Sequence, residues 1–266
     1  MNLRLDLAYD GGPFRGFARQ PDQRTVQGDI EVALGKLFGG EPRTVGAGRT
    51  DAGVHAVGQV LSVFDAPDDT DLRKVRDALN AMCAPHISVW QVKQAADDFH
   101  ARFSARSRTY VYAILNSEVP DPFVAGTSWF HPEPLHVDAM AEAAGHLLGP
   151  HDFSSFGRLP EATDPANPPS AERVLYELNV SRSDAMVRIK ARANAFIQQM
   201  VRSLVGTLAQ VGEGRKDPSD MMAILAAKDR AAAGPVAPPH GLCLVSVEYD
   251  EGWSYPPTAS DQGLSA

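Results

Sequence analysis

Length, composition and charge narrow the classes of protein to consider. The chain has 266 residues, of which 44% are hydrophobic and 22% are charged, as is usual for a soluble globular protein. This length suffices for one large domain or for two of about 130 residues, and either can bury a core without disulfides. The formal net charge of −8 argues, for the chain as a whole, against a polyanionic partner.

The distribution of charge weakens that objection. Residues 1–120 hold 14 lysines and arginines against 15 aspartates and glutamates, whereas residues 121–266 hold 11 against 18. Arg102, Arg106 and Arg108 follow one another at even spacing with no acidic residue between them. If this stretch is a strand, all three side chains point to one face and could bind phosphates. A solvated strand face is the simpler alternative.

Targeting and redox signals are weak. The first seven residues alternate polar and apolar side chains, unlike a signal peptide, and no run of about 18 apolar residues predicts a membrane helix. Cys83 and Cys243 are far apart and form no CxxC pair, so we interpret them as buried thiols in a reducing compartment. These observations predict a cytoplasmic protein without a membrane partner.

The first 115 residues are predicted to form an α+β half with a mainly antiparallel sheet. Apolar spacing predicts two helices, at Val26–Phe38 and at Asp71–Met82 after Thr70. Alternating apolar residues predict four strands, at Leu3–Tyr9, Gln59–Phe64, Ile87–Val92 and Arg108–Leu115.

Residues 116–255 are predicted to form a second α+β half, and residues 256–266 a disordered tail. Three helices are expected, at Val137–Leu148, Phe196–Val211 and Pro218–Lys228, the last with Asp217 as N-cap. Three strands are expected, at Arg173–Val180, Met186–Ala193 and Gly241–Tyr249. Prolines between Ser155 and Ser170 predict a long loop.

The segment Gly46–Ala56 is the one most suggestive of chemistry. Its glycines permit tight turns and close approach to a ligand, and Asp51 lies in the middle. A carboxylate there could cap a turn and pair with Arg49, bind a metal, or act as nucleophile or base. His55 is more simply a packed or hydrogen-bonded histidine, because no second His or Cys stands at metal-ligand spacing.

Several motifs, in order, resemble those of the TruA-type tRNA pseudouridine synthases. Gly48–His55 reads G-R-T-D-A-G-V-H, the core signature of that family. Phe17 stands where a tryptophan is common in the opening segment. The remaining matching stretches are Tyr9–Phe17, Thr25–Gln27, Phe99–Tyr112, Asn194–Arg202 and Gly241–Leu244. The resemblance covers about residues 3 to 250.

The resemblance assigns roles to four residues. It implies that Asp51 is the catalytic aspartate, that Tyr110 lies against the target base, and that Arg202 pairs with Asp51. It also implies that Leu242 packs in the active site. Without the resemblance, we would interpret Arg202 as a surface arginine and Tyr110 as a half-buried aromatic residue of a strand.

The implied reaction isomerises uridine to pseudouridine at positions 38–40 of the tRNA anticodon stem-loop, with no metal or other cofactor. The stacked base must be extruded. We expect Arg49 to occupy the space it leaves, and Arg102, Arg106 and Arg108 to hold the flanking backbone. A homodimer is implied, as is a fold of two ferredoxin-like halves around a central antiparallel sheet with helices packed on it.

Two rival functions remain open at this point. A glycosidase or nucleoside hydrolase would use two carboxyl groups, and no second acid stands in the Asp51 segment. A non-catalytic RNA-binding protein on the same scaffold would not need an acid at Asp51.

Overall fold

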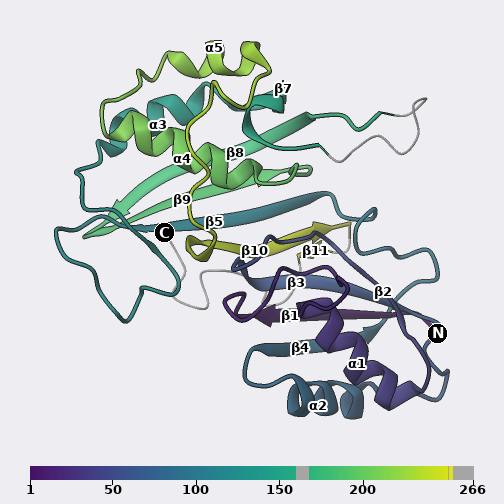
Figure 1. Ribbon diagram of the computed structural model, residues 1–266. Helices are drawn as coiled ribbons and strands as arrows, with labels where there is room; N and C mark the ends of the chain where they lie inside the picture. Colours follow the sequence, from purple (N-terminus) through teal and green to yellow (C-terminus); the bar gives the residue numbers. More distant parts are fainter. Residues whose placement is uncertain (160–167, 251, 254–266) are drawn as a thin grey trace. The chain divides into compact units, whose positions relative to one another are not determined.

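The computed structural model describes residues 1–159, 168–250 and 252–253 and divides the chain into two compact units (Figure 1). The first unit comprises Met1–Arg108 and the segment that begins at Cys243, and the second comprises Thr109–Leu242. The predicted halves, 1–115 and 116–255, differ from this division, because the last long strand pairs with a strand of the first unit. The tail predicted to be disordered, 256–266, lies outside the described residues.

The first unit is a mostly antiparallel sheet with two helices. Its helices are α1 (Val26–Phe38) and α2 (Leu72–Cys83), and its strands are β1 (Leu3–Tyr9), β2 (Arg43–Gly46), β3 (His55–Phe64), β4 (Ile87–Gln94), β10 (Leu242–Tyr249) and β11 (Gly252–Trp253). The strand order is β4-β1-β3-β10, with β2 beside β3 and β11 beside β10. The pair β3–β10 is parallel. Helix α1 packs beside α2, and α2 packs against β4 (Figure 1).

Strand β1 is buried on both faces, although its sequence alternates. Leu3, Leu5 and Leu7 are fully buried, and Arg4 and Asp6 between them are no more than 2% exposed. The Arg4 Nε lies 3.0 Å from Asp6 Oδ1, so the two charges compensate each other out of water. The Arg4 guanidinium also lies 4.6 Å from the centre of the Tyr249 ring.

Side-chain caps fix where the two helices of the first unit begin. Thr25 Oγ1 accepts a hydrogen bond from the Gly28 N–H at 3.2 Å, so α1 begins where its sequence predicts. Helix α2 begins one residue later than predicted. Asp71 is its N-cap rather than its first residue, because its carboxylate accepts from two backbone N–H groups, each at 3.1 Å.

The second unit is also a sheet with helices. Its helices are α3 (Val137–Gly145), α4 (Met200–Gly212) and α5 (Asp220–Ala227), with 3-10 turns at Ser154–Phe156 and Pro239–Gly241. Its strands are β5 (Ser107–Leu115), β6 (Trp129–Phe130), β7 (Gly149–Asp152), β8 (Glu172–Ser183) and β9 (Met186–Ala193). The strand order is β5-β9-β8-β7, with β6 parallel to β5. Helix α3 packs against both β8 and α4.

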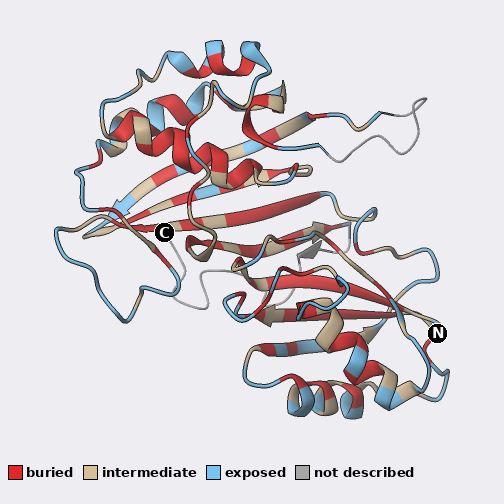
Figure 2. Cartoon of the chain, viewed as in Figure 1, coloured by how far each residue is buried: buried red, intermediate tan, exposed pale blue. Residues whose placement is uncertain are grey.

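Helix α4 is buried almost all round, as Figure 2 shows. Only Arg202 and Gln210 keep intermediate exposure. The helix begins at Met200, four residues after its predicted start, because Gln199 adopts the left-handed conformation with φ of 64°. Its sequence stripe therefore predicted a helix, but not one covered on every side.

Helix α5 is shorter than predicted and is not capped by Asp217. It begins at Asp220, with Ser219 in the N-cap position. The Asp217 carboxylate instead accepts from the N–H and the hydroxyl of Ser219, at 2.9 and 2.7 Å. The predicted α+β class with mainly antiparallel pairing is confirmed in both units.

Candidate active site

Asp51 lies on the loop that joins β2 to β3. The loop begins with Ala47, whose N–H donates to the Val60 carbonyl at 2.8 Å. It ends in a turn in which the Val54 N–H donates to the Asp51 carbonyl at 3.1 Å. Gly53 has a φ of 80° in this turn, where glycine is strongly favoured. Asp51 itself is half-buried.

The segment just before Asp51 is held by hydrogen bonds with Tyr9, Phe17 and Gln59. Thr50 is 7% exposed, and its hydroxyl lies 2.8 Å from the Tyr9 hydroxyl. The Thr50 carbonyl accepts from the Phe17 N–H at 3.1 Å. Gln59 Nε2 donates to the Gly48 carbonyl at 3.0 Å and to the Tyr9 hydroxyl at 3.3 Å. The backbone that leads into Asp51 is therefore restrained at Gly48 and at Thr50.

Two glycines permit the loop to approach the segment after β1. Gly16 has a φ of +105°, and a Cβ there would lie 3.0 Å from the Thr50 carbonyl oxygen. A Cβ on Gly46 would lie 2.3 Å from Cε1 of Phe17. The sequence predicts that Gly46 permits close approach to a ligand, and what it admits in the structure is the Phe17 ring of the same chain.

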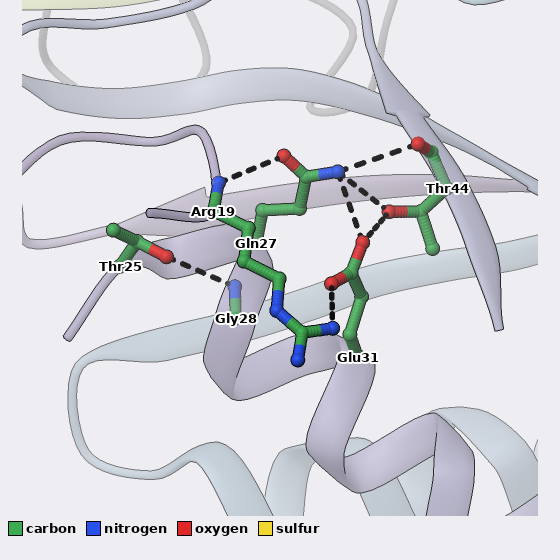
Figure 3. Close-up of polar contacts among 6 residues, drawn as sticks. All are labelled: Arg19, Thr25, Gln27, Gly28, Glu31 and Thr44. Carbon is green, nitrogen blue, oxygen red and sulfur yellow. Dashed lines mark hydrogen bonds and ion pairs between the residues drawn. The ribbon is translucent and has the colours of Figure 1, made fainter. Parts of the chain in front are cut away.

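A partly buried polar cluster fixes β2, the strand that leads into the loop (Figure 3). Gln27 Nε2 donates to Thr44 Oγ1 at 2.9 Å and to Glu31 Oε1 at 3.0 Å. The Thr44 hydroxyl donates to the same Glu31 oxygen at 2.7 Å. Arg19 donates from its guanidinium to Glu31 and from its backbone N–H to Gln27 Oε1, both at 3.1 Å. The cluster thus connects α1, β2 and the segment that contains Phe17.

Arg49 and His55 stand on either side of Asp51 in the loop sequence. Arg49 is exposed, and no ion pair of its guanidinium is found among the described residues. His55 is hydrogen-bonded, as predicted. Its Nδ1 accepts from the Gly11 N–H at 3.1 Å and lies 3.2 Å from the Asp10 carboxylate. The alternative in which Asp51 pairs with Arg49 is therefore not observed.

Arg202 is fixed in the second unit by the segment before β10. Its Nε donates to the Ala237 carbonyl at 2.7 Å, and the Ala237 N–H donates to the Arg202 carbonyl at 3.1 Å. The Tyr112 hydroxyl donates to the Pro238 carbonyl at 2.8 Å. The Leu242 N–H donates to the Pro239 carbonyl, and Leu242 is 5% exposed.

Tyr110 and Tyr112 follow each other on one face of β5, as predicted. Tyr110 is 7% exposed and meets Phe196 edge to face, with ring centres 5.2 Å apart. Burial raises the pKa of Tyr112, and the nearby charge of Arg202 offsets this only in part. Tyr112 is thus a neutral, fully buried phenol, while Arg202, Tyr110 and Leu242 all belong to the second unit.

The predicted stripe of three arginines on one strand face is wrong. Strand β5 begins only at Ser107, so Arg102 and Arg106 precede it. Arg106 makes a two-pronged ion pair with Asp250, with both distances 2.7 Å, which raises its pKa. Arg108 is buried and donates to the backbone carbonyls of Ala47, Arg102 and Ala105. Arg102 and Arg106 are both exposed, but the guanidinium of Arg106 is engaged by Asp250.

The two cysteines are not suited to nucleophilic or metal chemistry. Both are free thiols, and burial raises the pKa of Cys83 to about 11 and of Cys243 to about 12. Among the described residues, no group of three His, Cys, Asp or Glu side chains could hold a metal. Within the same part of the chain, no helix is long and apolar enough to cross a membrane.

Sequence reasoning passed over the residues that support Asp51. Gln59 had a signal: it is a polar residue within an apolar strand, and it is fully buried. Tyr9 and Phe17 had only their place in the matching opening segment. Their partners lie more than 30 positions away along the chain, which local patterns do not reveal.

Comparison with known proteins agrees with these motifs. The family model described as tRNA pseudouridine synthase matches residues 7–104 and 143–250. Curated proteins named tRNA pseudouridine synthase A are similar over nearly their whole length. That of Mesorhizobium japonicum is 45% identical over 254 residues, covering 93% of this chain and 98% of its own. Those of Rhodopseudomonas palustris and Paramagnetospirillum magneticum are 46% and 45% identical, each covering 92% of this chain and 98% and 94% of their own. The chain therefore belongs to the tRNA pseudouridine synthase family.

Proposed function

We propose that this protein converts uridine to pseudouridine at positions 38–40 of the tRNA anticodon stem-loop, with Asp51 as the catalytic carboxylate. Family membership gives the coarser part, an isomerase that acts on uridine in tRNA. The observation that carries the proposal is the run G-R-T-D-A-G-V-H, residues 48–55, on a loop restrained around Thr50. A restrained loop holds a reactive carboxylate in one geometry, as catalysis requires.

The reaction breaks the N1–C1′ bond of uridine, turns the uracil, and joins C5 to C1′. The C5 proton is lost and N1 ends protonated, so the nucleoside keeps its mass. An ionised Asp51 can assist by attacking C1′ or by removing the C2′ proton. Both routes need the same restrained carboxylate and remain alternatives.

Tyr110, Arg202 and Leu242 are proposed to complete the site. Tyr110 has an apolar ring that can stack on uracil and a hydroxyl that can take part in proton transfer at C5. Arg202 would pair with Asp51 through a charge-assisted hydrogen bond and so orient its carboxylate. Arg202 is one of two residues of α4 that are not buried. Leu242 would pack against the reacting nucleotide.

The surface arginines are proposed to handle the RNA backbone. The target base must leave its stack, which costs a few kcal/mol. Arg49 is exposed and two residues from Asp51, so it is suited to occupy the vacated space. Arg102 is proposed to contact the flanking phosphates. Arg106 and Arg108 engage Asp250 and backbone carbonyls, so their support for RNA would act through the loops they hold.

A homodimer in the cytoplasm is part of the same proposal, and it rests on the resemblance. Two copies could gather basic residues on one surface, which would help an acidic chain of net charge −8 to hold tRNA. The molar mass of the protein in solution, measured by light scattering with and without tRNA, tests the dimer. A monomer at the concentrations that support turnover would exclude it.

The central experiment replaces Asp51 by Asn, which keeps the size and removes the charge. Purified protein is incubated with unmodified tRNA and no added cofactor, and pseudouridine is mapped at each position. Asp51→Asn should bind tRNA with normal affinity but yield no detectable pseudouridine, whereas Asp69→Asn, at an exposed position of the same unit, should react normally. Near-normal turnover by Asp51→Asn refutes the assignment, and release of free uracil by the native protein would indicate a hydrolase.

Arg202 is tested by measuring a single turnover and tRNA affinity separately. If Arg202 positions Asp51, Arg202→Gln should slow the single turnover much more than it weakens tRNA binding. Arg202→Lys, which keeps the positive charge, should recover part of the lost rate, whereas a merely structural role would not favour the variant that keeps the charge. Loss of tRNA affinity with normal single-turnover chemistry would make Arg202 an RNA contact.

A further inference from the structure

The first unit carries a surface on which three neighbouring aromatic rings lie between two arginines. We define this aromatic–arginine surface by five residues: Arg43, Phe64, His100, Arg102 and Phe103. The Arg43 guanidinium lies 4.4 Å from the centre of the Phe64 ring, and the Phe64 and His100 rings are 6.1 Å apart. His100 and Phe103 stack, with centres 4.4 Å apart and planes 30° apart. The Arg102 guanidinium lies 5.5 Å from the Phe103 ring centre.

We propose that this surface binds an unpaired nucleobase of the tRNA substrate, with Phe103 as the stacking ring and Arg102 as the phosphate contact. Phe103 is 77% exposed, although it stands on an ordered turn. Stacking of unpaired bases on exposed aromatic rings is how proteins hold single-stranded RNA, with arginines adding electrostatic attraction. The inference needs only that the substrate is tRNA, not that the anticodon stem-loop is the modified region.

The turn that presents Phe103 is held rigidly from inside. The Ala101 N–H donates to Ser62 Oγ at 2.9 Å, and the Ala101 carbonyl accepts from the Tyr249 hydroxyl at 2.8 Å. His100 Nδ1 accepts from the N–H groups of Arg102 and Phe103, each at 3.3 Å. The His100 ring is thus oriented by the turn that it supports. A ring on such a turn loses little conformational entropy when a base stacks on it.

Charge favours a polyanion over a protein partner at this surface. No carboxylate lies within ion-pair distance of the Arg102 guanidinium among the described residues. Arg43 has only Asp65 nearby, at 3.6 Å, and both side chains are at least 70% exposed, so that ion pair is weak. On a chain of net charge −8, arginines stacked on rings with little counter-charge suit a phosphate-bearing ligand.

The surface is also connected to the catalytic loop within the first unit. The Arg108 guanidinium donates to the carbonyl of Arg102 and, at 3.0 Å, to the carbonyl of Ala47. Ala47 is the first residue of the loop that carries Asp51. One buried cation therefore fixes the spacing between the stacking ring and the catalytic loop, so that a base held at one sets the position of RNA at the other.

The test measures the affinity of full-length protein for an unmodified tRNA transcript at one fixed ionic strength. Phe103→Leu removes the ring but keeps an apolar side chain, and it should weaken binding about 5- to 10-fold. Phe103→Tyr keeps an aromatic ring and should therefore bind with native affinity. The matched control is Phe123→Leu in the second unit, because Phe123 is 95% exposed. This variant should bind tRNA with native affinity.

Two further measurements separate stacking from other causes. The fluorescence of Phe103→Trp should be quenched when tRNA is added, beyond the quenching of the native tryptophans. Arg102→Gln should reduce the salt dependence of binding by about one phosphate contact. Equal losses for Phe103→Leu and Phe123→Leu, or native affinity for Phe103→Leu, overturn the proposal.

Other roles of the surface give different results. If Phe103 is a contact between copies of this chain, Phe103→Leu will lower the molar mass measured by light scattering without tRNA, and the proposal fails. The inference is separable from the assignment of Asp51, because Asp51→Asn should lose chemistry and keep affinity. Phe103→Leu should show the opposite result, with weaker tRNA affinity and unchanged chemistry once the tRNA is bound.

Discussion

The hydrogen bond between Tyr9 and Thr50 allows the restraint of the catalytic loop to be tested directly. The two hydroxyl oxygens are 2.8 Å apart, and the side chains are 4% and 7% exposed. Water therefore has little access to replace either partner. We consider the substitutions Tyr9→Phe and Thr50→Val, each alone and both together.

The expected loss of stability follows from the burial of the pair. A buried hydrogen-bonding group that loses its partner costs about 1–3 kcal/mol. Tyr9→Phe leaves the Thr50 hydroxyl and one N–H of Gln59 with fewer partners, so we expect a loss of about 1–2 kcal/mol. For a chain of this size that lowers the melting temperature by about 2–4 °C for each kcal/mol. Removing both hydroxyls should cost about 1 kcal/mol less than the sum of the single changes.

Turnover should fall by more than the small loss of folding free energy would cause by itself, because Thr50 adjoins the proposed catalytic residue Asp51. A displacement of about 1 Å at a reacting group can cost on the order of 100-fold in rate. We expect single-turnover formation of pseudouridine by Tyr9→Phe to slow by about 10- to 100-fold at a temperature where the variant is folded. Additive losses of stability, or native rates in both single variants, would refute the idea that this pair positions the loop.

Three further outcomes are expected. Gly46→Ala should cost about 1–3 kcal/mol by overpacking and should slow turnover, because its Cβ would overlap the Phe17 ring; an equally active and stable variant contradicts this. The hydrogen bond from Lys228, at 2.8 Å, and those from Ser154 lower the pKa of Asp152 to about 2. Since that folded-state pKa is below the unfolded value, these contacts should stabilise the protein fully above about pH 4 and lose their effect as the pH falls toward 2. Because Lys228 is 62% exposed, solvent screening keeps the effect small, and urea unfolding of Asp152→Asn should converge with the native protein over that pH range. Finally, tRNA affinity should fall steeply with salt, and a flat response would exclude the proposed role of the surface arginines.

The elements that could be predicted are those whose side chains repeat with a clear period. Strand β1, helix α1 and strand β9 begin and end where the sequence predicts. The start of α4 could not be read in this way, because its apolar stripe continues through Phe196 and Ile197 without a break. Only the left-handed Gln199 separates these residues from the helix, and nothing in its side chain requires that conformation.

The arginines after Phe99 illustrate a different limit. Even spacing places side chains on one face only inside a strand, and here the strand begins at Ser107. What each arginine does is decided by residues distant in sequence. Asp250 binds Arg106, and the carbonyl of Ala47 binds Arg108, so composition alone could not distinguish a loop support from a surface contact.

Polar residues inside apolar strands carried information about the site that the motif did not. Strand β3 buries Gln59 and Ser62 among apolar neighbours, and burial of such groups without partners is costly. Gln59 donates to the loop before Asp51, and Ser62 accepts from the turn that presents Phe103. Both buried polar side chains of this strand thus support loops as well as the sheet. Restraint is therefore concentrated beside one carboxylate and one exposed ring, as a protein that positions a flipped nucleotide would need.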